Sequence, residues 1–240
     1  ECDEELRGWE WDRLNFLVDR STDTVQALDE AVRVVQFSGD GGRVMTAGEV
    51  GTTRVWNANS LEMVSEMRNP VGHAQPGASL SKDGESLVTT NGAAVYVWDA
   101  RNGALTQTID LPRAAAHDVA LDPDGRRIAV GYWQGDSEIY DRSTGAMLLQ
   151  LGRGTTTGRK VAFSRDGTRV LIGSLENQVS IFDAAVGEAL WVKRGAAFIL
   201  LNAAFSPDES LVATAGQDSR LWLRRSESGE LVYTVATGKG

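Results

Sequence analysis

The residues of this chain whose side chains are best suited to catalysis are few and scattered. The 240 residues include one cysteine, Cys2, and two histidines, His73 and His117. Nucleophilic catalysis needs a base beside a serine or cysteine. His117 precedes Asp118 on an expected strand, where neighbouring side chains point to opposite faces, so the two cannot form a catalytic dyad. We therefore predict no catalytic residues and no enzyme activity.

The sequence also contains no motif for binding metal ions or phosphate-bearing cofactors. One cysteine and two separated histidines do not make a metal-ligand set. The segment Asp122-Pro123-Asp124 lacks the later acids of a calcium loop. The glycine-rich segment 152–160 has the wrong spacing for a phosphate-binding loop and precedes an expected strand rather than a helix. We predict no metal and no cofactor.

The charge distribution argues against nucleic acid as a partner. The chain carries 24 Lys and Arg against 33 Asp and Glu, a net charge of -9. Residues 1–30 hold ten of the acids and only three arginines, so the rest is nearly neutral and offers no basic stripe for phosphates. The longest apolar runs are far shorter than the ~20 residues of a membrane-spanning helix. We expect protein partners, no nucleic acid, no membrane span and a cytoplasmic location.

A repeat of about 42 residues organises the chain, and it is marked three times over. A turn with an acid in its third position recurs at steps of 43, 41, 42 and 42 residues. An aromatic residue followed by Asp or Asn, and a separate glycine, each recur four times at steps of 42. The three sets are Asp40, Asp83, Asp124, Asp166 and Asp208; Trp56, Trp98, Tyr140 and Phe182; and Gly103, Gly145, Gly187 and Gly229.

Each repeat is expected to form four short antiparallel strands. In the fourth copy, the runs 160–163, 169–173, 179–182 and 189–192 alternate or are β-branched, and turn residues separate them. Strands this short, with a turn every 8–12 residues, exclude a helical repeat and a parallel βαβ sheet. Asp-Gly supplies a residue that accepts positive φ in the first turn of four copies. Glu209 replaces that glycine in the fifth copy, so we expect a looser turn there.

Four-stranded units of this length are typical of the blades of a β-propeller, and here the chain resembles the WD-repeat family. The segments 161–164 and 203–208, which enter the first turn, and the third-strand segment 95–99 carry this resemblance. It implies a non-catalytic scaffold that binds other proteins. The family's Gly-His pair is missing, and Asp218 is the only acid well placed before a third strand. The family's buried His-Ser-Asp-Trp network is therefore expected to be incomplete in every blade.

The predicted domain organisation is an acidic leader at 1–20 and a propeller at 21–240. Five blades are expected at about 31–68, 69–110, 111–152, 153–194 and 195–236. Each has its own fourth strand, yet residues 24–28 also read as a fourth strand, which favours a fragment of a larger ring, typically of seven blades. A five-bladed ring with a displaced N-terminal strand is the alternative.

A short motif in the leader adds a second resemblance. The segment Gly8-Trp9-Glu10-Trp11 is similar to one that precedes the propeller in large bacterial multidomain proteins, many of which carry an upstream Ser/Thr kinase domain. We expect the leader to contain a short helix. The resemblance implies that the parent polypeptide could carry a kinase domain outside this chain, with the propeller as its regulatory part.

Recognition is the function that remains, and the candidate binding residues lie in loops expected on one face of the propeller. Tryptophan and phenylalanine at loop positions that the repeat does not require are candidate hot spots for a protein partner. The candidates are Trp133, Gln134, Glu176, Phe198, Gln217 and Asp218. A propeller enzyme or small-molecule binder with a site in the central channel is the alternative class, but the expected innermost strands are apolar.

Overall fold

Twenty strands, arranged in five sheets, make up the fold. The computed structural model describes residues 25–70, 77–113, 115–152, 158–174, 176–194 and 200–236, and these contain no helix. Each sheet has four antiparallel strands in sequence order. The strands of the first three sheets are β1 (Val32–Phe37), β2 (Arg43–Gly48), β3 (Thr52–Asn57), β4 (Met63–Arg68), β5 (Ala78–Leu80), β6 (Ser86–Thr90), β7 (Ala94–Asp99), β8 (Ala104–Asp110), β9 (Ala116–Leu121), β10 (Arg127–Tyr132), β11 (Ser137–Asp141) and β12 (Met147–Leu151). Those of the last two are β13 (Lys160–Phe163), β14 (Arg169–Gly173), β15 (Gln178–Asp183), β16 (Ala189–Arg194), β17 (Leu200–Phe205), β18 (Leu211–Gly216), β19 (Arg220–Arg225) and β20 (Leu231–Ala236).

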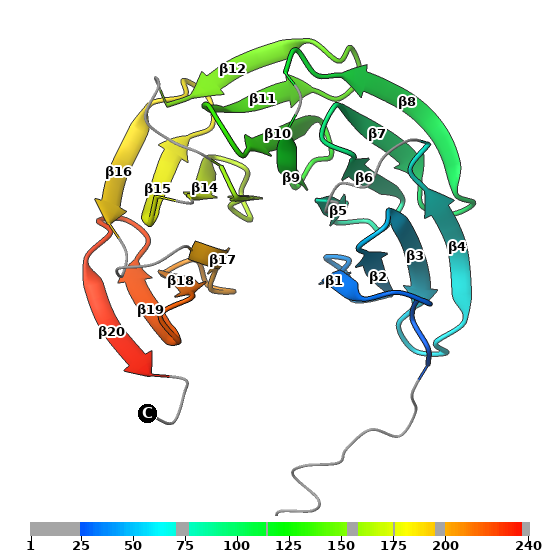
Figure 1. The fold of residues 1–240 in the computed structure, drawn as a ribbon, viewed down its shortest axis with the longest axis horizontal. Helices are drawn as coiled ribbons and strands as arrows, with labels where there is room; N and C mark the ends of the chain where they lie inside the picture. The colour runs from blue at the N-terminus through cyan, green and yellow to red at the C-terminus, as the bar shows by residue number, and fades with distance from the viewer. Residues whose placement is uncertain are drawn as a thin grey trace, which may run out of the picture.

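The five sheets stand around one axis like the blades of a propeller. Figure 1 shows the first strand of each sheet innermost and the fourth strand on the outer rim. The blades form an open arc, in which β1 and β17 face each other across the gap. The prediction of an all-β propeller with five four-stranded antiparallel blades is therefore confirmed. The predicted leader helix lies outside the described residues.

The extra fourth strand predicted at residues 24–28 is not a strand in its described part, 25–28. That strand was expected to complete a blade whose other strands lie outside this chain, so the described residues hold no partner for it and it stays a prediction. Ala27 is bound to the first blade, because Arg54 Nη1 donates to its carbonyl oxygen at 3.0 Å. Leu28 is buried.

The first turn is held by a serine and an acid in four of the five blades; in the third, Asp122 replaces the serine and accepts from Arg126 N at 2.7 Å. In the fourth blade, Ser164 Oγ donates to Asp166 Oδ1 at 2.6 Å, and Gly167 N donates to Ser164 O at 2.9 Å with a φ of 71°. The expectation of a looser turn at Glu209 is wrong: Glu209 N donates to Ser206 O at the same 2.9 Å, with a φ of 59°. Its carboxylate pairs with Arg169, which offsets part of the cost of that conformation.

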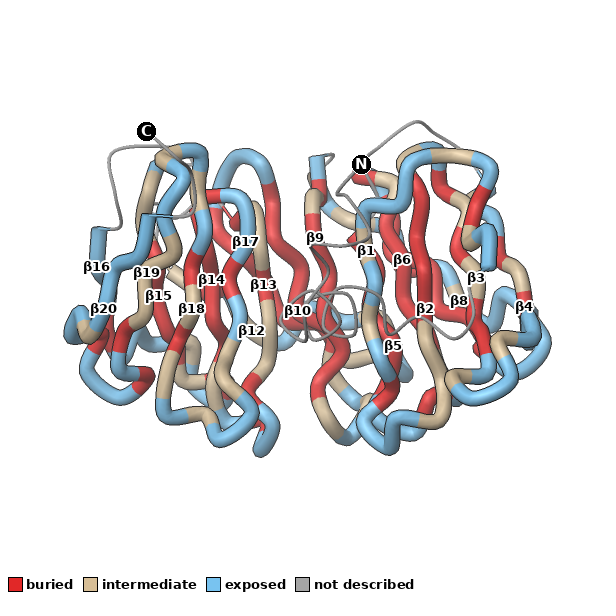
Figure 2. Tube along the Cα trace, turned by 90° about the horizontal axis from the view of Figure 1, so that it is seen from below, coloured by how far each residue is buried: buried red, intermediate tan, exposed pale blue. Residues whose placement is uncertain are grey.

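The hydrophobic core is divided into four clusters, one between each pair of neighbouring blades. One cluster joins the first two blades, and the last joins the fourth and fifth. Figure 2 shows buried residues running through the middle of the sheets and exposed residues at the turns. The three inner blades thus bury both faces on their neighbours, as expected for a repeat protein whose units are not stable alone.

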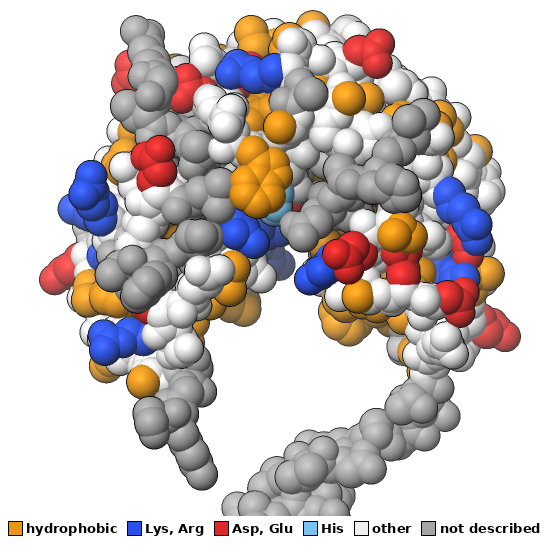
Figure 3. Space-filling view, viewed as in Figure 1, with side chains coloured by type: hydrophobic (Ala, Val, Ile, Leu, Met, Phe, Trp, Pro, Cys, Tyr) orange, Lys and Arg blue, Asp and Glu red, His pale blue; other side chains and the backbone are white. Residues whose placement is uncertain are grey.

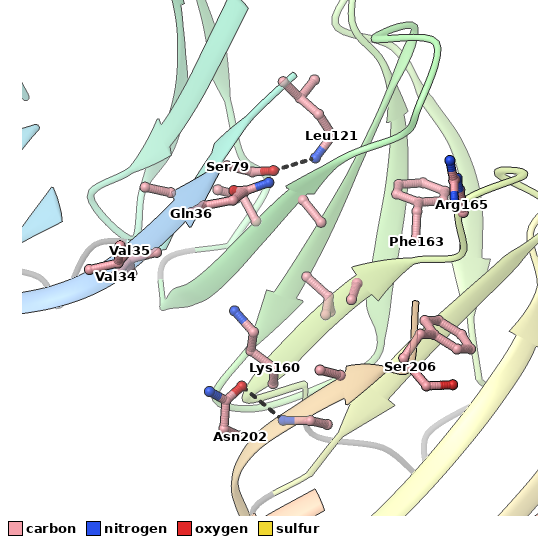
Figure 4. Close-up of a pocket in the computed structure, with 18 of the residues that line it drawn as sticks. Val34, Val35, Gln36, Ser79, Leu121, Lys160, Phe163, Arg165, Asn202 and Ser206 are labelled. Carbon is pink, nitrogen blue, oxygen red and sulfur yellow. Dashed lines mark hydrogen bonds between the residues drawn. The ribbon is translucent and has the colours of Figure 1, made fainter. Parts of the chain in front are cut away.

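Side chains on the innermost strands also bond directly to the next blade. Leu80 N donates to Gln36 Oε1 at 3.0 Å, and Leu121 N donates to Ser79 Oγ at 3.1 Å, the bond drawn in Figure 4. Val161 N donates to a carboxylate oxygen of Asp118 in the same way. These bonds fix the register between neighbouring blades around the axis.

The two end blades each leave one sheet face uncovered. On the first blade, Val35 and Phe37 are each 61% exposed. The strand register places Val35 opposite Thr46, as Val161 lies opposite Ile172, and Val161 is only 1% exposed. On the last blade, Tyr233 is 65% exposed, although its counterpart by register in the fourth blade, Trp191, is 7% exposed. Positions that are buried between blades elsewhere are therefore open at both ends of the arc.

Candidate interaction site

The exposed indole of Trp133 marks the candidate site. It lies in the loop between β10 and β11, at the end of the blades where second strands turn into third strands and where one blade connects to the next. We call this end the connection face; Figure 3 views it and shows hydrophobic, histidine and Lys or Arg side chains gathered beside the central opening. Trp133 is 38% exposed, and its backbone N donates to Ala115 O at 3.0 Å.

Two neighbours hold the indole in place. The ring of His117, from β9, meets that of Trp133 edge to face, with centroids 4.6 Å apart. The guanidinium carbon of Arg159, just before β13, lies 5.7 Å from the centroid of the indole. His117 Nδ1 lies 2.8 Å from Arg159 O and carries the proton of that bond, because a carbonyl oxygen only accepts. One side chain thus links the third blade, the fourth blade and the indole.

Burial governs the charge state of His117. Desolvation lowers the pKa of the imidazole, while the bond to the Arg159 carbonyl and the charge of Asp118 oppose that change. The nearby charges of Arg159 and Lys160 lower the pKa further. Nε2 is buried without a hydrogen-bond partner, so a proton there would be poorly solvated. The imidazole is therefore neutral near pH 7.

A buried carboxylate binds the residues on either side of the Trp133 loop. Glu138, 2% exposed, accepts bonds from Tyr132 Oη at 2.8 Å and Tyr140 Oη at 2.5 Å, and pairs with Arg113 Nη2 at 2.5 Å. Burial is the main cause that raises the pKa of both tyrosines, that of Tyr140 to about 12, so both hydroxyls stay protonated as donors. This network ties the connection before β9 to the strands on either side of the loop.

The cations around Trp133 differ in whether they are paired with a carboxylate. Arg113 is neutralised by Glu138, and Lys160 Nζ lies 3.1 Å from a carboxylate oxygen of the buried Asp118. None of the ion pairs between described residues involves Arg159. The local surface therefore presents one guanidinium without an acidic counterpart beside an exposed indole, on a chain that is acidic as a whole.

The other candidates predicted from the sequence have different surroundings. Gln134 is exposed beside Trp133, while Glu176 and Gln217 are exposed in equivalent loops of the fourth and fifth blades. Asp218 is already used within its own blade, because Trp222 Nε1 donates to its Oδ2 at 2.9 Å. No interaction between described residues links these side chains to Trp133. Phe198 lies outside the described residues.

His117 and Arg159 are the site residues that the sequence reasoning missed. His117 was considered only as a catalytic base, and Arg159 only as part of a phosphate loop. The signal that could have found them is their separation of 42 residues, one repeat, which places them at equivalent heights on neighbouring blades. Asp118 and Lys160 are separated in the same way.

The central channel is the second place to look for a site. A cavity of about 610 Å³ lies between the innermost strands, and Figure 4 shows the residues around it. Its walls mix apolar with polar and charged side chains, and those of Gln36 and Ser79 bond to the backbone of the neighbouring blade. Asn202 Oδ1 accepts from Ala203 N, the next residue of β17, at 2.9 Å. The first two bonds join neighbouring blades, and none of these three groups pairs a nucleophile with a base.

Two further observations bear on the kinds of partner. Within the described residues, no cluster of three or more His, Cys, Asp or Glu side chains is placed to hold a metal ion. No helix in that part of the chain has the length and apolar character needed to cross a membrane.

Comparison with known proteins agrees with this architecture. No sequence model of a protein family matches the chain. A WD repeat-containing protein of uncharacterised function from Deinococcus radiodurans is 32% identical over 111 residues. That match covers 39% of this chain and 42% of the relative, so the chain spans less than half of the relative's length. The repeats of this chain are thus similar to WD repeats.

The structural comparison covers more of the chain. The Cps50 (Swd1) β-propeller domain of Myceliophteria thermophila superposes with a TM-score of 0.74 at 16% identity. The superposition covers 89% of this chain and 73% of that domain. The structural likeness shows the β-propeller fold, and the sequence likeness shows repeats similar to WD repeats.

Proposed function

We propose that this chain is a non-catalytic protein-interaction scaffold whose partner surface is the connection face around Trp133. The observation that carries the proposal is an exposed tryptophan at a position where the repeat does not require one, since one period earlier the residue is Asn91 and two periods later Gln217. Tryptophan is enriched among residues that dominate binding energies at protein interfaces. Ring contacts with His117 and Arg159 hold its indole before any partner arrives, which reduces the entropy lost on binding.

We further propose that the five blades are part of a larger ring. The exposed faces of the first and last blades support this, because their apolar residues occupy positions that are buried between blades elsewhere. Val235 is 51% exposed on the last blade, whereas Leu151, its counterpart by register in the third blade, is fully buried. A blade face exposed to water in this way lacks the burial of apolar area that stabilises the four junctions between neighbouring blades.

The structural comparison supports a proposal for the size of the additional part. Five blades correspond to 73% of the Cps50 domain, which leaves room for about two more blades of the same size. Two copies of the arc joined at both ends would make about ten blades, more than the 4–8 that propellers typically contain. The occupants we propose are therefore further blades rather than a second copy.

The proposed partner surface can be tested by quantitative affinity purification from cells that produce the protein. The Trp133→Ala variant should capture the specific partners of the unchanged chain about tenfold less well, because the removed indole is a hot-spot side chain. Arg126→Gln is the matched control: Arg126 is exposed in a first turn, at the opposite end of the blades. Undiminished capture of every partner by Trp133→Ala, with its melting temperature unchanged, would reject the surface.

A further inference from the structure

We propose that the surface formed by Trp133, His117 and Arg159 recognises an acidic peptide segment. In this arrangement one Asp or Glu carboxylate of the partner binds the Arg159 guanidinium, and a neighbouring apolar side chain packs on the Trp133 indole. The inference rests on the proposed function, since it specifies the chemistry of the partner for the same surface.

The charge balance of the site is the first argument. Three cations among the described residues lie around the Trp133 loop, and two of them already face carboxylates that are almost fully buried. Those pairs are part of the fold, because separating either would leave a buried charge alone. Arg159 is the cation whose charge no described carboxylate offsets; its guanidinium lies over the ring of Trp133, and the residue is half-buried, so part of it stays open to a partner.

The positive charge that the site offers favours one kind of anionic partner over the others. A guanidinium presents a planar fork of donors that matches a carboxylate with two parallel hydrogen bonds. A phosphorylated side chain carries nearly two negative charges and is typically bound by clusters of arginines, whereas the described residues of this site include one uncommitted arginine. Nucleic acid would need a basic stripe along its phosphates, and the sequence outside residues 1–30, which is nearly neutral, offers none.

The indole supplies the second half of the recognition. Trp133 is 38% exposed, while the edge-to-face contact with His117 fixes the ring plane from one side. Because the imidazole is neutral, the contact with His117 adds no second cation, and the exposed part of the ring remains an apolar surface. A partner side chain such as Leu can cover it while an adjacent carboxylate reaches Arg159. An acidic residue next to an apolar one is therefore the motif that the geometry fits.

The test uses three labelled peptides with a common Gly/Ser frame. The first carries repeated Glu-Leu pairs, the second has Gln in place of Glu, and the third has phosphoserine in place of Glu. Fluorescence anisotropy at low ionic strength should show the Glu peptide binding about tenfold more tightly than the Gln peptide, as expected for a charge-assisted pair. Arg159→Gln should abolish that difference, Trp133→Ala should weaken both peptides, and Arg126→Gln should change neither.

Several outcomes would overturn the inference. These are no binding of the Glu peptide at ~1 mM, equal binding of the Glu and Gln peptides, or a preference for Glu that survives Arg159→Gln. Tighter binding of the phosphoserine peptide would assign the surface to phosphorylated partners instead. If Trp133→Ala loses the natural partners while the Glu and Gln peptides bind equally, the peptide chemistry is wrong and the proposed surface stands. If Trp133→Ala changes neither the capture of natural partners nor the binding of the peptides, the proposed surface itself is wrong.

Discussion

At the scale of single residues, the buried carboxylate of Glu138 determines how firmly the Trp133 loop is held. Two tyrosine hydroxyls and one arginine converge on it, so its charge is compensated by directed bonds rather than by solvent. A partner that binds the loop therefore meets a surface whose shape is already set.

The Glu138→Gln variant tests this support. The amide removes the countercharge of Arg113 and places donors opposite hydroxyls that already donate. Because Arg113 is partly exposed, we expect the free energy of unfolding to fall by about 2 kcal/mol, below the cost of breaking a fully buried pair. Urea denaturation of Glu138→Gln beside the exposed-site control Glu176→Gln measures the effect. Equal stability of the two variants would show that the network contributes nothing.

The titration of His117 gives a second prediction at this scale. Its pKa in the folded protein lies below the ordinary value of 6.5, so the unfolded chain binds more protons in the interval between the two pKa values. Stability should therefore decrease as the pH falls through 6.5 toward the folded pKa. His117→Gln, which cannot titrate, should flatten that part of the profile of melting temperature against pH. A profile that is unchanged in this variant would assign the pH dependence to other groups.

At the scale of elements, contacts between neighbouring blades recur at equivalent positions of successive repeats. Arg127 is an example: Nε pairs with Asp122 in its own turn at 2.8 Å, and Nη2 donates to Gly167 O in the next blade at 2.6 Å. Its guanidinium also lies 5.3 Å from the centroid of the Phe163 ring. One side chain, anchored in its own blade by a salt bridge, thus couples it to the next blade through a hydrogen bond and a ring contact.

Removing this link should weaken the junction between the third and fourth blades. Arg127→Met keeps the aliphatic stem but leaves the carboxylate of Asp122, which is 3% exposed, without its cation. We expect a loss of about 3 kcal/mol in the free energy of unfolding. The neighbouring exposed residue supplies the control, since Arg126→Gln should change stability by less than about 0.5 kcal/mol. Denaturant midpoints of the two variants that coincide would contradict this role of Arg127.

Much of the element scale could be predicted from the sequence, because the repeat imposes it. Acid-containing turns spaced by about 42 residues, together with alternating apolar residues, require four short strands per unit, and five such sheets are observed. The turn at Glu209 could not be predicted, because Arg169 in the preceding blade binds its carboxylate. The strand expected at 24–28 stays a prediction, because the blade that it would complete is not among the described residues.

The candidate site was less predictable than the fold. Trp133 was found because it departs from the repeat, and the departure is visible in the sequence. Its partners His117 and Arg159 lie on neighbouring blades, so their proximity depends on how blades stack rather than on local sequence. Asp218 illustrates the converse: its loop position suggested binding, yet its carboxylate is occupied by Trp222 of the same blade.

At the scale of the whole molecule, the account depends on blades burying their faces on one another. The uncovered faces of the arc carry Val35, Phe37, Tyr233 and Val235, which are 51–65% exposed. Outer-rim residues such as Met147 and Val186 are 54% and 62% exposed, a similar range, but no blade is expected to cover them. Their positions, and not their exposure, distinguish the two groups: the first lies on blade faces that we propose are covered by further blades, and the second consists of ordinary exposed apolar residues.

Hydroxyl-radical footprinting of the protein as its cells produce it tests this claim most directly. If further blades complete the ring, Phe37 and Tyr233 should be protected severalfold relative to the isolated 240-residue chain, while Met147 on the rim should react equally in both. Equal reactivity of Phe37 and Tyr233 in the cellular protein and in the isolated chain would contradict the account.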